Sequence, residues 1–158
     1  MSLDAAVSPA VRTRYLCDFS IDFDEIQTIP TGTGLRLNYV VREGVVTGDR
    51  LSGTFIAGGG DWITIGTDQI GHLDVRATVR TDDGELIYIT NTGRVDLRGG
   101  IAERLGAGEA LTSKDLYARS APLFETGSEK YAWMNSIVTV ALNGLAPQHV
   151  DYSIFEIL

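Results

Sequence analysis

Side chains that could carry out acid–base chemistry gather in three short segments of this chain, each of which combines a carboxylate or an amide with aromatic residues. The segments are Gly58-Gly59-Gly60-Asp61-Trp62, Pro122-Leu123-Phe124-Glu125-Thr126-Gly127 and Tyr131-Ala132-Trp133-Met134-Asn135. A carboxyl group beside apolar rings loses hydration, which raises its pKa and lets it give or take a proton near neutral pH. Both tryptophans of the chain lie in these segments, as expected for the wall of a small-molecule pocket.

A further candidate is the alternating segment 72–80, in which Asp74, Arg76 and Arg80 share one face. If this face points outward, it is an ordinary solvated surface. If it points into the protein, Asp74 and Arg76 are buried ions, which are costly unless paired and therefore mark a functional site. A buried Arg76 would bind a carboxylate or enolate oxygen through two parallel hydrogen bonds, and Asp74 would orient it or transfer a proton.

These patterns define a set of candidate site residues. The catalytic candidates are Asp61, Arg76 and Glu125. The substrate-binding candidates are Trp62, Asp74, Tyr88, Phe124, Trp133 and Asn135. Structural roles stay open for several of them, because Asp61 can cap a turn, Glu125 can lie in a solvated loop, and Asn135 can end a helical turn.

The sequence lacks the usual patterns of metal and nucleotide cofactor sites. His72 and His149 are the only histidines, and no cluster of cysteine or acidic residues completes a metal-binding spacing with them. The glycine run before Asp61 lacks the lysine and hydroxyl residues of a phosphate-binding loop. We therefore expect no metal and no cofactor.

Composition limits the expected partners and location. The 158-residue chain has a net charge of −8, which disfavours nucleic acid and anionic membranes and leaves a small molecule as the expected ligand. No apolar run approaches the roughly 20 residues that span a bilayer, and no signal peptide is recognisable. The single cysteine, Cys17, cannot form an internal disulfide and is expected to be a buried thiol of a cytoplasmic protein.

Alternation with a period of two residues dominates the chain and predicts strands rather than helices. The expected strands cover residues 13–21, 34–42, 45–47, 51–57, 61–66, 71–81, 84–95, 115–124, 136–143 and 149–157. Short turns such as Asp83-Gly84 connect them, so the sheet is expected to be antiparallel. Helix is expected only as one or two short turns, at 101–105 and 129–135.

This element order predicts an all-β protein. Closing the sheet removes its exposed edges, which favours a closed antiparallel β-barrel of about 8–10 strands over a sandwich. A barrel of this size holds either its own side chains or one small ligand. Residues 1–12 are expected to form a flexible N-terminal tail, and residues 13–158 a single barrel domain.

The motifs as a set resemble those of the bacterial and fungal family DUF3237, also called UPF0311. The matching segments are Gly59-Gly60-Asp61-Trp62, Asp74-x-Arg76, Thr81-Asp82-Asp83-Gly84, Ile87-Tyr88, Asn91-x-Gly93, Pro122-x-Phe124-Glu125-Thr126-Gly127 and Tyr131-Ala132-Trp133-x-Asn135. The resemblance implies a small barrel, similar in outline to calycins and allene-oxide-cyclase-like proteins, and a homo-oligomer of two or more copies. It implies no activity, because the family is named for its lack of an assigned function.

Three functions stay open at this point. The first is a cofactor-independent isomerase, cyclase or lyase acting on a small, partly apolar carbonyl compound, in which Arg76 holds an oxyanion and Asp61 or Glu125 moves a proton. The second is a binding or carrier module that uses the same cavity without chemistry. The third is a structural or interaction barrel whose interior is filled by its own side chains.

Overall fold

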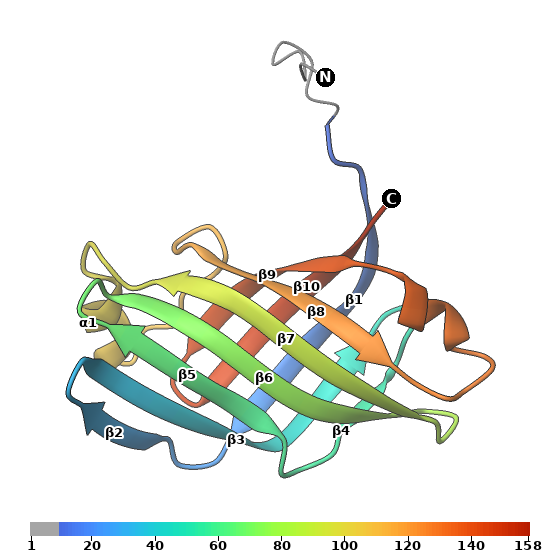
Figure 1. Cartoon of the computed structure of the whole chain (residues 1–158), viewed down its shortest axis with the longest axis horizontal. Coiled ribbons are helices and arrows are strands. Elements are labelled where there is room, and N and C mark those ends of the chain that lie inside the picture. The colour runs from blue at the N-terminus through green and yellow to red at the C-terminus, as the bar shows by residue number, and fades with distance from the viewer. Residues whose placement is uncertain (1–9) are drawn as a thin grey trace.

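The computed structural model describes residues 10–158, and within this range the chain is mostly β-sheet (Figure 1). The elements follow in the order β1 (Thr13–Phe23), β2 (Gln27–Thr31), β3 (Gly34–Thr47), β4 (Gly53–Phe55), β5 (Gly60–Gly66), β6 (Ile70–Thr81), β7 (Leu86–Asp96), α1 (Ile101–Gly106), β8 (Ala118–Glu125), the 3-10 helix η1 (Ala132–Ser136), β9 (Thr139–Ala146) and β10 (His149–Ile157). Most of the tail expected at residues 1–12 lies outside the described residues.

The strands form one antiparallel sheet that closes on itself. Neighbours follow the order β1-β10-β9-β8-β7-β6-β4-β3-β2, and β5 also lies between β3 and β6. Pairing of β1 with β3, from Asp18 opposite Thr47 to Phe23 opposite Val41, completes the ring. The result is a closed eight-stranded barrel in which β4 and β5 share one position beside β3 and β1 and β2 share the position on its other side. The predicted all-β antiparallel barrel is confirmed.

Side-chain alternation decides which residues face the barrel interior. Along β6, Leu73, Ala77 and Val79 are buried, whereas Asp74 and Arg76 between them are exposed. Burying the apolar row is favourable by about 25 cal/mol for each Å² removed from water, and the opposite row must then face solvent. The same alternation orients the other barrel strands.

Apolar side chains pack one half of the barrel interior, which we call the filled half, and the other half, which we call the hollow half, contains a cavity. The filled half holds a large apolar cluster that includes Leu16, Ile87, Met134 and Ile154, each at most 1% exposed. A smaller apolar cluster, which includes Leu73, lies at the other end and packs against α1. Helix α1 and η1 lie at opposite ends of the barrel (Figure 1), and Met134 of η1 belongs to the filled half.

Charged side chains close the filled end. Glu156 of β10 accepts a hydrogen bond from Arg14 Nη2 at 2.7 Å and another from Arg50 Nη1 at 2.5 Å. These two hydrogen bonds hold the pKa of Glu156 below its usual value. The Arg50 guanidinium also lies 4.3 Å from the ring centre of Trp133, so η1 is fastened over this end of the barrel.

Most strands lie within three residues of their expected bounds, and two differ more. β3 runs without a break through residues 43 and 44, where the prediction separates strands 34–42 and 45–47, and its pairing with β1 skips Arg42. β2 is not predicted at all, since its residues are all exposed and include Pro30. The two short helices lie close to their expected positions.

Candidate functional site

A cavity of about 600 Å³ occupies the hollow half of the barrel and reaches α1. Its wall is mostly apolar and includes Phe23, Leu37, Ile63, Leu73, Val95 and Leu105. The volume lies within the roughly 300–1,000 Å³ of typical small-molecule pockets. Its polar lining includes Tyr39, Asp61, Asn143 and Tyr152. An apolar wall with a few polar groups is the usual composition of a binding site for an organic molecule.

The glycine run places Asp61 inside the barrel. Gly58 has a φ of 100°, which favours glycine, and a Cβ at Gly60 would collide with the carbonyl oxygen of Tyr39. Glycine therefore allows the chain to turn and β5 to begin close against β3. Asp61 lies opposite Tyr39 on β3 and Val75 on β6, and it is 5% exposed.

Burial changes the protonation of Asp61. Its Oδ1 accepts a hydrogen bond from the backbone N–H of Asp74 at 2.9 Å, and its Oδ2 accepts none within residues 10–158. Loss of hydration raises the pKa of Asp61 to about 7, an effect that the hydrogen bond from Asp74 only partly offsets. At neutral pH the carboxyl is therefore present in both protonation states, which suits a group that accepts and returns a proton.

Two tyrosines share the cavity with Asp61. Tyr39 is its direct neighbour across the β3–β5 pair, and Tyr152 lines the cavity from β10. Burial raises the pKa of both phenols, and the negative charge of Asp61 raises it further. Both phenols therefore keep their protons at neutral pH and can donate hydrogen bonds to an oxygen atom of a bound molecule.

Further polar side chains continue around the interior. Asn91 Nδ2 on β7 donates a hydrogen bond to Ser120 Oγ at 3.2 Å, and Ser120 Oγ on β8 donates one to Asn143 Oδ1 on β9 at 3.3 Å. Asn143 lies opposite Tyr152 on β10. We call six of the inward polar residues, which come from β3, β5, β7, β8, β9 and β10, the polar belt. Its members are Tyr39, Asp61, Asn91, Ser120, Asn143 and Tyr152.

The sequence prediction includes Asp61 from the polar belt and misses the rest. The alternation of the strands indicates these residues, because they lie on the same strand face as buried apolar residues. Asn91 follows Ile89 by two residues, and Asn143 follows Ala141 by two residues. A polar residue inside an apolar row predicts a buried polar group that needs a partner.

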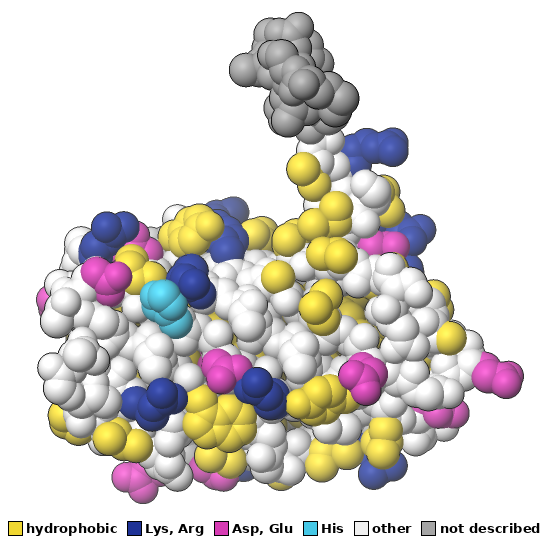
Figure 2. Space-filling model, viewed as in Figure 1, with side chains coloured by type: hydrophobic (Ala, Val, Ile, Leu, Met, Phe, Trp, Pro, Cys, Tyr) yellow, Lys and Arg dark blue, Asp and Glu magenta, His cyan; other side chains and the backbone are white. Residues whose placement is uncertain are grey.

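Asp74 and Arg76 lie outside the barrel, so the first of the two alternatives, a solvated surface, holds, and their candidate roles in a buried site are corrected. Their side chains are 54% and 53% exposed, and Arg76 Nη1 forms an ion pair with Asp74 Oδ1. The cause is the strand period, which turns Leu73 inward and Asp74 outward. Figure 2 shows charges of both signs interspersed over the outer surface in this view.

Glu125 and Tyr88 also lie on the outer surface. They are opposite each other on β8 and β7, and both are exposed. Phe124, the neighbour of Glu125, points inward and is buried, but it packs in the filled half rather than along the cavity. The structure therefore brings none of these three candidates to the cavity that contains Asp61.

The two tryptophans do not line the cavity either. Trp62 follows the inward Asp61 on β5 and therefore lies on the opposite, outer face of the strand, where it is half-buried. Trp133 of η1 packs against the filled half and beneath Arg50. Both indole side chains therefore lie away from the polar belt.

The side chain of Asn135 binds the backbone of Thr126, in the loop after β8, and is not available to a ligand. Its Oδ1 accepts a hydrogen bond from the backbone N–H of Thr126, and its Nδ2 donates one to the carbonyl oxygen of Thr126, both at 2.9 Å. Such a two-sided contact uses both ends of the amide. It ties η1 to the end of β8, which is a structural role close to the helix-capping alternative.

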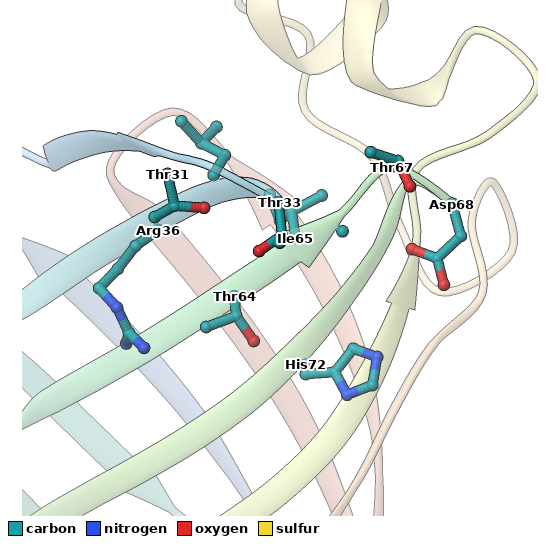
Figure 3. A pocket seen from close by; sticks show the side chains of 10 residues that line it. Thr31, Thr33, Arg36, Thr64, Ile65, Thr67, Asp68 and His72 are labelled. Carbon is teal, nitrogen blue, oxygen red and sulfur yellow. The ribbon is translucent and has the colours of Figure 1, made fainter.

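A second, shallow hollow lies on the outer surface beside β2, β3, β5 and β6 (Figure 3). Arg36, Thr64 and His72 lie opposite one another on β3, β5 and β6. In the adjoining turn, Asp68 Oδ1 accepts a hydrogen bond from the backbone N–H of Ile70 at 3.1 Å. None of the residues that line this hollow is buried. Water therefore screens electrostatic interactions more strongly there than in the cavity.

Three further observations concern other types of site. Within residues 10–158, no group of three or more His, Cys, Asp or Glu side chains is placed to hold a metal ion. In the same range no helix is long and apolar enough to cross a membrane. Cys17 is buried, and burial raises the pKa of its thiol to about 12, so the nucleophilic thiolate is scarce at neutral pH.

Comparison with known proteins finds similar β-barrels. A family model described as "Protein of unknown function (DUF3237)" matches residues 11–157. A UPF0311 protein of Rhodopseudomonas palustris is 28% identical over 155 residues, which cover 96% of this chain and 97% of that protein. Its crystal structure, described as a conserved protein of unknown function, has a TM-score of 0.88 at 26% identity and covers 96% of this chain and 100% of that chain.

Two other crystal structures share the architecture. One, described as a beta-barrel like protein from Acinetobacter baumannii, has a TM-score of 0.80 at 25% identity and covers 97% of this chain and 99% of that chain. The other, described as an enzyme from Penicillium herquei, has a TM-score of 0.68 at 19% identity with the same coverage. This last likeness concerns the fold alone.

Proposed function

The chain belongs to the DUF3237 family of proteins of unknown function, and we propose that it binds a small, largely apolar carbonyl compound in the barrel cavity and moves a proton on it through Asp61. One observation carries the proposal: a carboxyl that is 5% exposed, with its pKa raised to about 7, lines an apolar cavity of about 600 Å³. Strongly perturbed titratable groups in a cavity are typical of acid–base sites.

The geometry supports a cofactor-independent isomerase, cyclase or lyase. The ionised Asp61 accepts a proton from a carbon next to the carbonyl group, and the electron pair moves onto the carbonyl oxygen. Tyr39 or Tyr152 stabilises that oxygen by donating a hydrogen bond from its phenol. In an isomerase or cyclase, Asp61 then returns the proton to another atom of the same molecule; in a lyase, it gives the proton to the leaving group as the bond to that group breaks. In each case the protein ends in its starting state.

The fold is compatible with catalysis, because a Penicillium herquei protein with a similar barrel is described as an enzyme. The runner-up function is a non-catalytic carrier, which the mostly apolar wall of the cavity favours. The same cavity argues against a barrel filled entirely by its own side chains. A carrier and an enzyme are distinguished by whether the bound molecule leaves unchanged.

The chemical proposal is tested by proton exchange. A panel of small apolar ketones is incubated with the protein in D₂O, and deuterium incorporation beside the carbonyl group is followed by NMR. We expect Asp61→Asn to lose about 10²-fold or more of the exchange rate, in line with the usual contribution of a general base. Glu125→Gln, which changes an exposed carboxylate on the outer surface, should keep it. Exchange that survives Asp61→Asn would remove Asp61 from the mechanism.

Binding is tested independently of turnover. Ile63 lines the cavity, so Ile63→Trp should fill part of it and abolish the thermal stabilisation that a bound ketone produces. A ligand at a hundred times its Kd stabilises the folded state by about 2.7 kcal/mol. Leu123→Trp, on the exposed face of β8, is the matched control. Equal stabilisation of both variants would place the binding site elsewhere.

The remaining expectations about partners belong to the same proposal. We infer that the protein acts on a small molecule in the cytoplasm, without nucleic acid or membrane as a partner, and as a homo-oligomer. Light scattering coupled to size-exclusion chromatography measures the mass of the assembly, and a monomer at micromolar concentration would contradict the last of these expectations.

A further inference from the structure

A small chamber adjoins the inner side of the large cavity. Its volume is about 20 Å³, and it shares the lining residues Phe23, Asp61 and Tyr152 with the large cavity. A space needs roughly 10–15 Å³ to hold one water-sized group. The chamber therefore has room for a single polar group and not for the body of an organic molecule.

Asn91 lines this chamber and has an unpaired oxygen atom. Asn91 is 4% exposed and lines the chamber, and its Oδ1 has no hydrogen-bond partner within the described residues. Its Nδ2 is already used, because it donates to Ser120 Oγ, which in turn donates to Asn143 Oδ1. Because both hydrogen bonds run from Asn91 toward Asn143, the Oδ1 atom of Asn91 is the acceptor that stays without a donor.

An unpaired buried acceptor is costly to the folded protein, because water is lost from it and nothing replaces that water. An apolar side chain at this position would avoid the cost, since the neighbouring inward residue Ile89 is apolar and buried. The acceptor therefore needs an occupant that supplies a hydrogen-bond donor.

The other polar groups of the chamber narrow the chemistry of that occupant. Tyr152 lines the same chamber, and its phenol stays protonated, so it can donate a hydrogen bond to a group bound there. A hydroxyl group is the smallest organic group that donates one hydrogen bond and accepts another. A carbonyl oxygen would leave Asn91 Oδ1 unpaired.

We propose that the chamber is the subsite for one hydroxyl group of the bound molecule, which donates to Asn91 Oδ1 while the apolar body fills the large cavity. The inference rests on the proposed function, because it needs a ligand in that cavity. It makes Asn91 a specificity-determining residue and the ligand a hydroxylated, largely apolar compound. Combined with the proton transfer at Asp61, it points to a substrate with both a hydroxyl and a carbonyl group.

The test compares one carbon skeleton in two forms, 1-indanol with a hydroxyl and 1-indanone with a carbonyl. Isothermal titration calorimetry measures both on the full chain and on Asn91→Leu, which removes the acceptor at similar volume. We expect Asn91→Leu to weaken 1-indanol at least tenfold and to change 1-indanone by less than twofold. Thr92→Val, on the exposed side of β7, should alter neither affinity.

The calorimetry distinguishes failure of the hydroxyl subsite from failure of the proposed function. Equal loss for both compounds, or a larger loss for the ketone, overturns the hydroxyl subsite but leaves the cavity as a binding site. Failure of both compounds to bind the wild-type protein counts against the proposed function itself. If Asn91→Leu does not fold, a crystal structure of the wild-type protein with 1-indanol decides: the hydroxyl must lie within about 3.2 Å of Asn91 Oδ1, and a hydroxyl elsewhere with water in the chamber refutes the proposal.

Discussion

Replacing Asp61 with asparagine should change how the stability of this protein depends on pH. Burial raises the pKa of Asp61 from 3.8 to about 7 in the folded protein, whereas the unfolded chain keeps the ordinary value. Between these two values the unfolded chain releases a proton that the folded protein retains. The contribution of Asp61 to stability is therefore fully present below pH 3.8 and is lost as the pH rises through about 7. The amide of the Asp61→Asn variant does not titrate, so this contribution is absent from it.

The size of the effect follows from the two pKa values. Each unit of pKa difference corresponds to about 1.36 kcal/mol, so the whole transition is worth roughly 4 kcal/mol. Between pH 5 and pH 8, the part that falls in the accessible range is about 2 to 3 kcal/mol. We therefore expect the wild-type protein to lose about this much stability relative to Asp61→Asn over that interval.

Urea unfolding at pH 5, 6, 7 and 8, followed by circular dichroism, measures the free energy of unfolding of both proteins. Taking the difference between them at each pH removes the contribution of groups common to both, such as His149. Glu125→Gln serves as the matched control, because it changes an exposed carboxylate on the outer surface of β8. A wild-type minus Asp61→Asn difference that stays constant from pH 5 to pH 8 would refute the reasoning, since it would mean that Asp61 is not a buried carboxyl.

Three further predictions concern other parts of the barrel. Glu156→Gln should lower the free energy of unfolding by about 1 to 3 kcal/mol, because Arg14 and Arg50 lose their charged partner. In urea titrations, this loss of stability should become smaller as the pH falls from 4.5 toward the lower pKa that Glu156 has in the folded protein. Cys17 should react with iodoacetamide at pH 8 only as fast as the protein unfolds, because its thiol is buried; rapid labelling of the folded protein would contradict this. Asn135→Ala should cost about 1 to 2 kcal/mol in stability while leaving the Kd of a cavity ligand unchanged by calorimetry.

The strands were predictable from the sequence because their cause is local. The backbone pleat turns successive side chains to opposite faces, so a half-buried strand must alternate between apolar and polar residues. β6 and β10 show this alternation clearly. β2 does not, because all five of its residues are exposed and its place depends on pairing with β3. Its formation is therefore decided by a partner strand that its own residues do not identify.

The candidate site was predictable only at Asp61, where a glycine run and an acidic residue adjoin in the chain. The direction in which each strand faces was harder to predict, because a row such as Asp74 and Arg76 can be read as a solvated surface or as a buried ion pair. The cost of burying unpaired charge decides in favour of the surface, and the exposed ion pair agrees with that outcome.

Alternation and turn residues by themselves determined the antiparallel strands and the acidic residue that follows the glycine run, Asp61, since both depend on neighbours along the chain. Tertiary structure alone decided that Asp61 meets Tyr39, Asn91 and Tyr152. These residues are brought around one interior by strand register and by the pairing of β1 with β3. Register and closure depend on contacts between residues far apart in the chain, which no local pattern specifies.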